Sequence, residues 1–378
     1  MINVAIMGFG TIGAGVADVF KENAATIARC AGEEIRLKYV LDVLDFPSSP
    51  FAELVIHDFA VIENDPEVQI VVETMGGVGA AYQFVRRSLL AGKSVVTSNK
   101  ELVAAKGHEL LGIAQEKNVN FLFEASVGGG IPIIRPITQC LAANEIDEIY
   151  GILNGTTNYI LTQMIENGVS FADALADAQA KGFAERDPAA DVEGRDACRK
   201  ICILSDLCFG KQIDPEGVSA QGITSVSLQD VENAQKAGFR IKLLGRALRR
   251  PDGRIHAYVA PHLLPESSLL SNVSGVMNGI VVHGNAIGEV MFYGAGAGKR
   301  PTASAVTADV IDAAKHLHAR KFLGWDDAEA DFVADTDELV SRWYVRLPEG
   351  EPVFTEPMSG AAVRAAWPES AAAYRIMD

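Results

Sequence analysis

The sequence predicts an α/β protein: a doubly wound parallel sheet followed by a second, α+β domain. Apolar strand-like segments alternate with helical patterns through the first 140 or so residues. A glycine-rich turn directly follows the first of these segments. At 378 residues, the chain exceeds the size at which a single hydrophobic core keeps growing. Two domains are therefore expected.

Composition narrows the classes of partner and compartment. A net charge of -16 and a pI near 4.9 argue against nucleic acid or an acidic membrane surface as a partner. The sequence has no apolar run of about 18 residues, and its N-terminus passes straight into a strand-like segment. The five cysteines include no CxxC pair and suit reduced thiols. We therefore expect a cytoplasmic protein.

The first strand and the turn after it predict dinucleotide binding. The strand-like segment 2–7 leads into GFGTIG at residues 8–13, and an amphipathic helix then runs toward Arg29. Gly8 permits the tight turn, Gly10 lets the backbone approach a pyrophosphate, and Gly13 lets helix and strand pack closely. The helix N-terminus supplies N–H donors for the phosphates. This pattern is typical of a Rossmann-type domain.

The end of the second strand bears on the choice between NAD and NADP. The strand predicted over 35–41 ends at Asp42, where a carboxylate can bind the adenine ribose hydroxyls and disfavour a 2′-phosphate. No Arg or Lys follows in VLDFP. The sequence therefore leans slightly toward NAD.

Three further strands are predicted at 68–73, 94–97 and 119–124, each followed by a polar or glycine-rich loop. Lys100 lies just after the second of these, so it either points into the ligand crevice or opens the next helix on the surface. The third loop contains three consecutive glycines at 128–130. There the backbone must approach another segment, a ligand or an ion.

The pattern changes to an α+β domain after about residue 140. A strand at 145–153 precedes the polar loop NGTTN and a helix to about residue 166. An acidic stretch at 183–200 leads into a helix that starts near Glu193 and stops at Gly210. Asp196 and Lys200 are i,i+4 neighbours on it, as either a solvated surface pair or part of a site.

The remaining segments complete the predicted domain plan. Strands from Phe239 onward form a mixed or antiparallel sheet whose open face could carry a dimer interface. A second glycine-rich loop, GAGAG at 294–298, precedes a helix from about 302 to 318 that should return to the first domain. The plan is 1–140 with 299–320 as the dinucleotide-binding domain, 141–298 as the catalytic and dimerisation domain, and 321–378 as a tail.

From residue 1 to about 320 the sequence resembles the homoserine dehydrogenases. Several long motifs occur in the family's order, which chance does not explain. They are GFGTIG at 8–13, ETMGG at 73–77, SNKELVA at 98–104, FEASVGGGIPI at 123–133, GILNGTTNYIL at 151–161, KGFAERDPAADVEGRDACRKICIL at 181–204 and GAGAG at 294–298.

The resemblance implies the interconversion of L-homoserine and L-aspartate 4-semialdehyde with NAD or NADP, a step of threonine and methionine biosynthesis, by a homodimer or homotetramer. It makes Lys200 the acid–base with Asp196 beside it, and puts Lys100 between nicotinamide and substrate. Positions around the substrate match Gly155, Thr156, Glu185, Asp191 and Asp196. Cofactor contacts match Gly10, Thr11, Ile12, Gly13, Thr74, Ser98, Lys100 and Gly298, and the strand and turn pattern adds Gly8 and Asp42 as cofactor-binding candidates. A site for a monovalent cation, Na⁺ or K⁺, matches Glu124, Val127, Gly129 and Ile131.

The residue types agree with that chemistry. No Cys–His pair suggests a thiohemiacetal route and no His cluster suggests a zinc site, so the candidate base is a lysine with a pKa lowered by burial. Asp196 would oppose this lowering but would orient Lys200. The substrate ammonium needs carboxylates, which Glu185 and Asp191 can supply.

Two departures and two alternatives accompany the resemblance. The family often has tyrosine where this chain has Phe183. RWYVRL at 342–347 resembles the first strand of a regulatory ACT domain, but too little chain follows to complete one, so we expect weak or absent inhibition by threonine. A different dehydrogenase would lack the NGTTNY and acidic motifs. An NAD-sensing regulator would carry a DNA-binding helix-turn-helix and a basic face.

Overall fold

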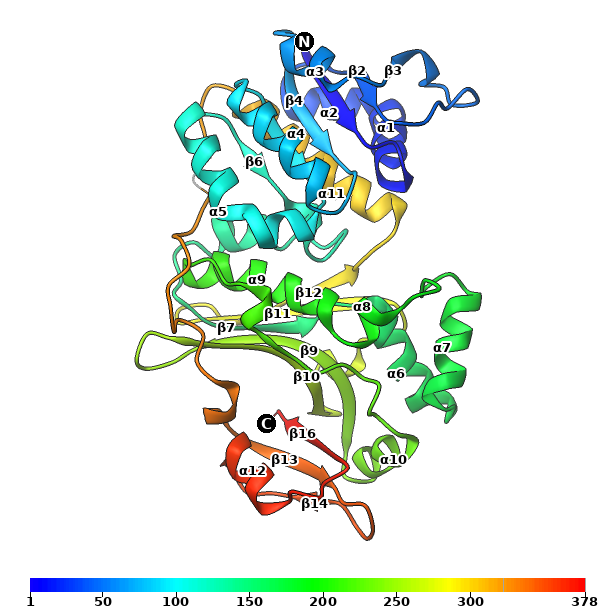
Figure 1. Ribbon diagram of the computed structural model, residues 1–378, viewed down its shortest axis with the longest axis vertical. Coiled ribbons are helices and arrows are strands. Elements are labelled where there is room, and N and C mark those ends of the chain that lie inside the picture. Colours follow the sequence, from blue (N-terminus) through cyan, green and yellow to red (C-terminus); the bar gives the residue numbers. More distant parts are fainter. Residues whose placement is uncertain (322, 378) are drawn as a thin grey trace. The chain divides into compact units, whose positions relative to one another are not determined.

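The computed structural model describes residues 1–321 and 323–377 (Figure 1). The chain divides into two compact units, each with its own sheet. Unit 1 comprises Met1–Cys140 and Ala297–Asp327, and unit 2 comprises Leu141–Gly296 and Ala328–Asp378. Unit 1 is thus made of two segments of the sequence that are far apart.

Unit 1 is built on a six-stranded parallel sheet with strand order β3-β2-β1-β4-β5-β6. The order reverses between β1 and β4, and ligands of such sheets bind outside the carboxyl ends of the strands at this point. The predicted Rossmann-type fold is confirmed. The strands are β1 Ile2–Met7, β2 Ile35–Leu41, β3 Val55–Ile56, β4 Val68–Glu73, β5 Ser94–Thr97 and β6 Phe121–Leu122.

Helices flank this sheet, and two differ from the predicted bounds. The helix predicted to run toward Arg29 is interrupted at Asn23, whose φ of -109° and ψ of 19° are not helical. The helix predicted at about 302–318 lies at Lys299–Lys315. The helices are α1 Thr11–Glu22, α2 Ala24–Ala31, α3 Phe59–Asn64, α4 Gly79–Leu90, α5 Lys100–Lys117 and α11 Lys299–Lys315.

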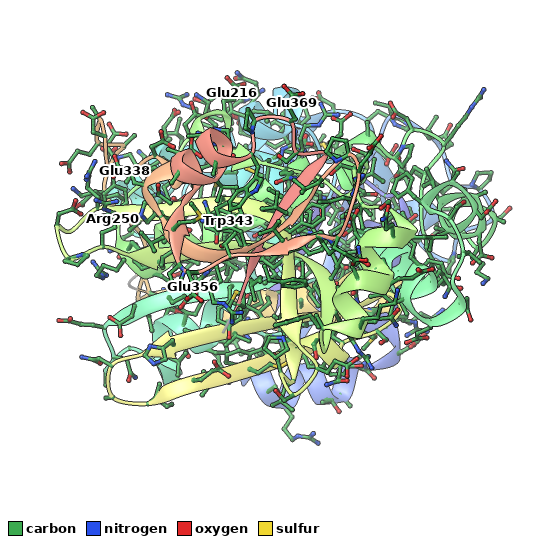
Figure 2. The ribbon with its side chains drawn as sticks, turned by 90° about the horizontal axis from the view of Figure 1, so that it is seen from below. Glu216, Arg250, Glu338, Trp343, Glu356 and Glu369 are labelled. Carbon is green, nitrogen blue, oxygen red and sulfur yellow. The ribbon has the colours of Figure 1, made fainter. Side chains whose placement is uncertain are left out.

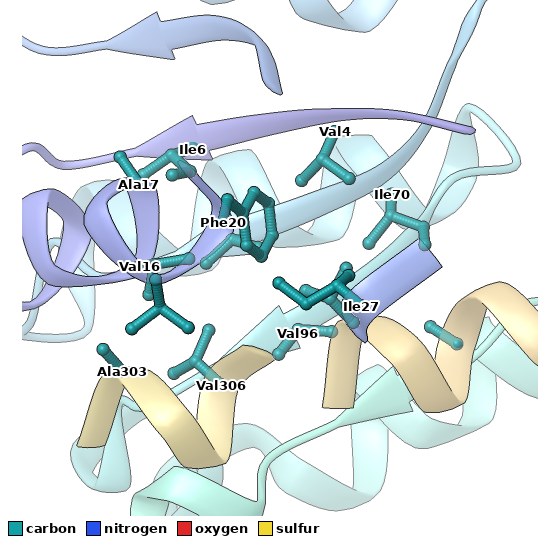
Figure 3. Close-up of a cluster of buried hydrophobic side chains, with 14 of the residues drawn as sticks. Val4, Ile6, Val16, Ala17, Phe20, Ile27, Ile70, Val96, Ala303 and Val306 are labelled. Atoms are coloured by element: carbon teal, nitrogen blue, oxygen red, sulfur yellow. The ribbon is translucent and has the colours of Figure 1, made fainter. Parts of the chain in front are cut away.

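Helix α11 completes the core of unit 1. Figure 3 shows Ala303 and Val306 of α11 beside Val16 of α1, in one apolar cluster with side chains from β1, β4 and β5. These side chains are buried, and burying each one stabilises the fold by roughly 1–3 kcal/mol. The core that supports the glycine-rich turn is therefore completed by a helix nearly 300 positions further along the chain.

The strand predicted at 119–124 is wrong at both ends. Only β6, Phe121–Leu122, is extended, because Phe123 leaves the strand at φ -151° and ψ 35° and a short 3₁₀ turn, Glu124–Ser126, follows. The Glu124 carboxylate explains the change. It accepts hydrogen bonds from the backbone N–H groups of residues 133–135, at 2.6–2.8 Å.

Unit 2 is built on a ten-stranded mixed sheet, as predicted, with the main order β12-β11-β7-β9-β10-β16-β13-β14. Its pairs are antiparallel apart from β16 and β8 on β10. Gly294 and Ala295, expected in a loop, belong to β12. The strands are β7 Ile146–Ile152, β8 Ser219–Ala220, β9 Phe239–Arg249, β10 Ile255–Pro265, β11 Met277–Gly284, β12 Gly288–Ala295, β13 Val340–Arg346, β14 Val353–Phe354, β15 Met358–Ser359 and β16 Ala372–Ile376.

The C-terminal segment, expected as a separate tail over 321–378, shares this sheet from residue 328 onward. Its strand β16 pairs in parallel with β10, and RWYVRL is largely β13. Among the described residues, no helix has both the length and the apolarity needed to cross a membrane. The helices of unit 2 are α6 Gly155–Asn167, α7 Phe171–Ala180, α8 Ala189–Val192, α9 Arg195–Phe209, α10 Leu228–Lys236 and α12 Gly360–Ala366.

Candidate active site

Helix α9 carries the two candidate catalytic residues of unit 2. It begins after Gly194, at φ 84°, and ends at Gly210, at φ 81°; both angles favour glycine. Asp196 and Lys200 are only 4% and 8% exposed. The interpretation of this pair as a solvated surface ion pair is therefore wrong. Burying two charges is costly unless both are paired and hydrogen-bonded.

Two interactions hold the Lys200 ammonium. Its Nζ lies 2.7 Å from Asp196 Oδ2 and donates a second hydrogen bond of 2.8 Å to the backbone oxygen of Leu153, just after β7. A lysine ammonium has three N–H donors. Among residues 1–321 and 323–377 the third donor has no acceptor, so it remains for another group.

Asn154, which the sequence interpretation missed, joins the pieces of this site. Its amide nitrogen donates to Asp196 Oδ2 at 2.8 Å and to Asp191 Oδ1 at 2.7 Å. Its amide oxygen caps α6 by accepting from the N–H of Thr157 at 2.8 Å. The only signal in the sequence is the helix-capping position before GTTN. The Asn154 side chain thus fixes the start of α6 and the carboxylates of Asp191 and Asp196.

The start of α6 brings two more of the predicted residues here. A Cβ on Gly155 would lie 2.6 Å from the backbone oxygen of Val276, so only glycine allows this close approach. The Thr156 hydroxyl donates to the backbone oxygen of Phe183 at 2.7 Å. The Phe183 ring is 41% exposed and lies 4.9 Å from the ring of Tyr159.

The two carboxylates predicted to bind the substrate ammonium, of Asp191 and Glu185, differ in environment. Burial raises the pKa of Asp191, the hydrogen bond from Asn154 lowers it, and the neighbouring Asp196 raises it further. Glu185 is exposed, and within the described ranges its carboxylate has no hydrogen bond or ion pair. The structure therefore brings Asp191 of α8 into the Lys200 cluster and leaves Glu185 exposed in the segment before α8.

In unit 1 the glycine-rich turn has the features that a bound pyrophosphate requires. A Cβ on Gly13 would lie 2.0 Å from the backbone oxygen of Gly8, so the third glycine is needed for close packing of α1 on the strand. Gly8 has a φ of 90°, and nothing lies within 4 Å of a Cβ on Gly10. The turn thus leaves open backbone at the N-terminus of α1, beside Thr11 and Ile12. These residues fit a dinucleotide.

Two side chains, of Thr74 and Asp42, form hydrogen bonds to that turn. Thr74 Oγ1 donates to the backbone oxygen of Gly8 at 2.7 Å. Asp42, expected to bind ribose hydroxyls, accepts from the N–H groups of Phe9 at 2.6 Å and Leu44 at 3.0 Å while remaining partly exposed. The sequence did not single out Glu73, which is fully buried and accepts from Thr97 Oγ1 at 2.5 Å; burial raises its pKa.

The other cofactor candidates lie at helix starts in unit 1. Ser98 follows β5, and Lys100 is the first, partly buried residue of α5. The helix is capped by Asn99, whose side chain accepts from the N–H of Leu102 at 3.1 Å. Lys100 therefore both opens a helix and stands near a strand's carboxyl end, so the two interpretations coexist. Gly298 precedes α11 with a φ of 121°.

The candidate cation site is a buried loop in the same unit. Val127 and Ile131 are buried, and Gly129 has a φ of 56°. Among the described residues, no group of three or more His, Cys, Asp or Glu side chains could hold a metal ion. The side-chain oxygens of Glu124 are occupied by N–H groups of the backbone. A cation here would therefore rely on backbone carbonyls, a donor set that suits Na⁺ or K⁺.

Comparisons with known proteins cover nearly the whole chain. The family model for the homoserine dehydrogenase NAD binding domain matches residues 8–124, and the homoserine dehydrogenase family model matches residues 132–311. The homoserine dehydrogenase of Neisseria gonorrhoeae is 42% identical over 92% of this chain and 81% of the relative. That of Helicobacter pylori is 41% identical over the same shares.

Solved structures agree. A homoserine dehydrogenase from Thiobacillus denitrificans has a TM-score of 0.90 and 35% identity, covering 100% of this chain and 98% of its own. The Staphylococcus aureus enzyme at pH 7.5 has a TM-score of 0.81 and 31% identity over the same shares. A hyperthermophilic archaeal homoserine dehydrogenase in complex with NADPH has a TM-score of 0.70 and 30% identity, covering 82% of this chain and 97% of its own. The chain belongs to the homoserine dehydrogenase family.

Proposed function

We propose that this NAD(P)-dependent oxidoreductase interconverts L-homoserine and L-aspartate 4-semialdehyde with Lys200 as its proton donor and acceptor. The observation that carries the assignment is the buried Lys200 ammonium, which two interactions hold while its third N–H donor remains available. A fixed ammonium with one available proton suits an oxygen whose charge changes during reaction.

The proton step follows from this geometry. In the direction of reduction, Lys200 Nζ donates its third proton to the aldehyde oxygen as that oxygen becomes an alkoxide. In the direction of oxidation, the neutral amine takes the hydroxyl proton. A bound nicotinamide supplies or accepts the hydride at the carbon that carries this oxygen. The Asp196 carboxylate holds Nζ in place, at 2.7 Å.

Asp191 and Glu185 would bind the amino group of the substrate. Asp191 uses one oxygen for Asn154 and keeps acceptor capacity for an ammonium. Glu185, six residues earlier in the chain, is exposed and would be the second acceptor. Gly155 and Thr156 form the wall of this region at the start of α6. An ammonium there would favour the charged form of Asp191.

The remaining assignments concern cofactor binding, the cation, the oligomeric state and the location of the protein. Backbone at residues 8–13, with Thr74, Ser98, Lys100 and Gly298, would hold the dinucleotide, and Asp42 favours NAD over NADP through its acidic charge. A monovalent cation would sit on the carbonyls of 124–131. Tyr293 in the edge strand β12 and Ile287 just before it are exposed, which supports a homodimer or homotetramer. A cytoplasmic location is part of this proposal.

One assay tests the function and the base together. Absorbance at the nicotinamide band is followed with homoserine and either NAD or NADP, for wild type and Lys200→Ala. We expect the variant to lose about 10²–10⁴-fold in kcat. Lys93→Ala is the matched control, because Lys93 is also buried and held by backbone carbonyls.

Two results would contradict the proposal at different levels. Wild type that reduces neither cofactor with homoserine would overturn the activity. Undiminished turnover in Lys200→Ala, with normal activity in the control, would overturn the assignment of the base alone. Comparing kcat/KM for NAD and NADP decides the cofactor preference, and replacing Na⁺ and K⁺ by a bulky organic cation tests the cation.

A further inference from the structure

Unit 2 contains a pocket apart from the Lys200 cluster. It is formed by β10 and the C-terminal segment. Its volume is about 310 Å³, which lies at the lower end of the range for small-molecule sites. Trp343 of β13, labelled in Figure 2, lines it together with Tyr258 of β10 and Arg375 of β16. The apolar part of the wall includes Val259, Pro261 and Val363.

Arg375 is a buried cation with no anionic partner in this wall. Its side chain is on a residue only 5% exposed, and its guanidinium lies 4.2 Å from the Trp343 ring centre. Within residues 1–321 and 323–377 it forms no ion pair with a carboxylate. Asp337, the pocket's carboxylate, is committed to Arg364 through two hydrogen bonds. One positive charge therefore remains uncompensated.

The hydrogen bonds of Arg375 leave one edge of the guanidinium available. Nη1 donates to the backbone oxygen of Leu339 and to Ser341 Oγ, both at 3.1 Å, and Nη2 donates once, to the backbone oxygen of Thr336 at 2.6 Å. The Nε–H and the second Nη2–H have no acceptor among the described residues. Nε does not belong to the side-chain atoms that are both sealed from solvent and without a hydrogen-bond partner. These two donors form the fork that matches a carboxylate.

We propose that this pocket binds a small carboxylate-bearing molecule, whose carboxylate pairs with the Nε and Nη2 edge of Arg375 and whose apolar part lies against Val259, Pro261 and Val363. An unpaired buried charge is costly, so an anion that neutralises it is favoured. A carboxylate suits one charge and two donors better than a phosphate, which carries more charge and more acceptor oxygens. Arg364 also lines the pocket, but its guanidinium is already paired with Asp337.

Isovalerate and benzoate are suitable probes, with isovaleramide as the neutral isostere of the first and inorganic phosphate as the alternative anion. Binding to the full chain is measured by titration calorimetry and by the shift of the thermal midpoint at millimolar ligand. We expect saturable binding of at least one carboxylate, none of isovaleramide, and binding weakened about tenfold or more in Arg375→Met. Arg300→Met, an arginine on the surface of unit 1, should bind as wild type does.

A second variant keeps the test decisive if Arg375→Met does not fold. Ala260→Leu leaves Arg375 in place and adds volume to a wall that Ala260 lines, so it should abolish binding of the same probe. Equal affinity in wild type and both variants would overturn the proposal, as would the absence of carboxylate binding to wild type. Phosphate binding in place of both carboxylates would overturn the ligand class.

Discussion

At the scale of single residues, Asn154 is the side chain on which the Lys200 cluster depends. It donates to the carboxylates of Asp191 and Asp196, and it caps α6. Asp196 in turn holds Lys200. A change at Asn154 should therefore act on catalysis through the position of the two carboxylates and on stability through the cap.

We expect Asn154→Ala to lower kcat/KM roughly tenfold to a hundredfold, because the carboxylates lose their shared donor. It should also lower the free energy of unfolding by about 1 kcal/mol through the lost cap. Asn154→Asp keeps the cap acceptor and adds a third carboxylate, so it should retain stability but not activity. Steady-state kinetics and denaturant unfolding measure both. Full activity in both variants would contradict the positioning role.

Asp191 predicts a pH dependence of substrate affinity. Burial raises its pKa, so on acidification it takes up a proton at a higher pH than an ordinary aspartate does, and its affinity for an ammonium falls with it. The KM for homoserine should therefore rise as pH falls in wild type. In Asp191→Asn it should be high and lack this rise. A wild-type KM that is constant on the acid side would refute the ammonium-binding role.

The sequence could predict the Asp196–Lys200 contact because it is local: an i,i+4 spacing on a helix places the two side chains together wherever the helix lies. It could not predict that the pair is buried or that Asn154 joins it to Asp191. Asn154 lies 37 and 42 positions from its two acceptors, so that contact depends on how the helices pack. The role of Glu185 in binding the substrate ammonium remains a prediction, because it also depends on how the helices pack.

At the scale of elements, a buried lysine fixes α6 on the sheet. Lys242 of β9 is 1% exposed, and its Nζ donates to Asn158 Oδ1 at 3.1 Å and to the backbone oxygen of Val273 at 2.6 Å. Burial lowers its pKa to about 8. Helix α6 therefore rests on a cation whose charge is costly in this environment.

This burial predicts how stability depends on pH. Between about pH 8 and its ordinary value of 10.5, Lys242 is protonated in the unfolded chain but not in the folded one, so stability rises with pH there. The difference in the free energy of unfolding between wild type and Lys242→Met should grow over this window by at most about 3 kcal/mol. Lys236→Met, at an exposed site on α10, is the control. A difference that does not change with pH would contradict the prediction.

Element types were predictable where periodicity is strong, and element ends were not. Strands β1, β4 and β5 are mostly apolar and mostly buried, which indicates burial on both faces. The end of β6 is set instead by Glu124, whose carboxylate binds a turn about ten residues later. The sequence has no Pro or Gly near Asn23 that would predict the break between α1 and α2.

At the scale of the whole chain, the C-terminal segment is an integral layer of unit 2. Asp230, which is fully buried, accepts from Tyr344 Oη and Arg346 Nε, each at 2.8 Å. Arg250 and Glu338, labelled in Figure 2, form an ion pair of 2.9 Å between the β9–β10 hairpin and this segment. Removing the segment would leave Asp230 as an unpaired buried charge.

We therefore expect β13 and β16 to be protected in native-state hydrogen exchange to the same degree as β10, because they form one hydrogen-bonded sheet. Arg346→Met should lower the protection of β13 and β10 together. Its matched control is Arg195→Met, an exposed arginine of α9 that pairs with Glu193. Fast exchange throughout residues 340–376, with β10 protected, would show that the segment is an independent appendage.

The two-part composition of unit 1 has a consequence for synthesis on the ribosome. β1 to β6 emerge first, but one face of their sheet is covered by Ala303, Val306 and Val310 of α11. That helix is made only after the whole of Leu141–Gly296, which at roughly 5–20 residues per second takes on the order of ten seconds. During that delay the nascent sheet exposes Val4, Ile6 and its neighbours. Unit 1 therefore cannot become fully native until α11 has been made, although most of its residues are synthesised first.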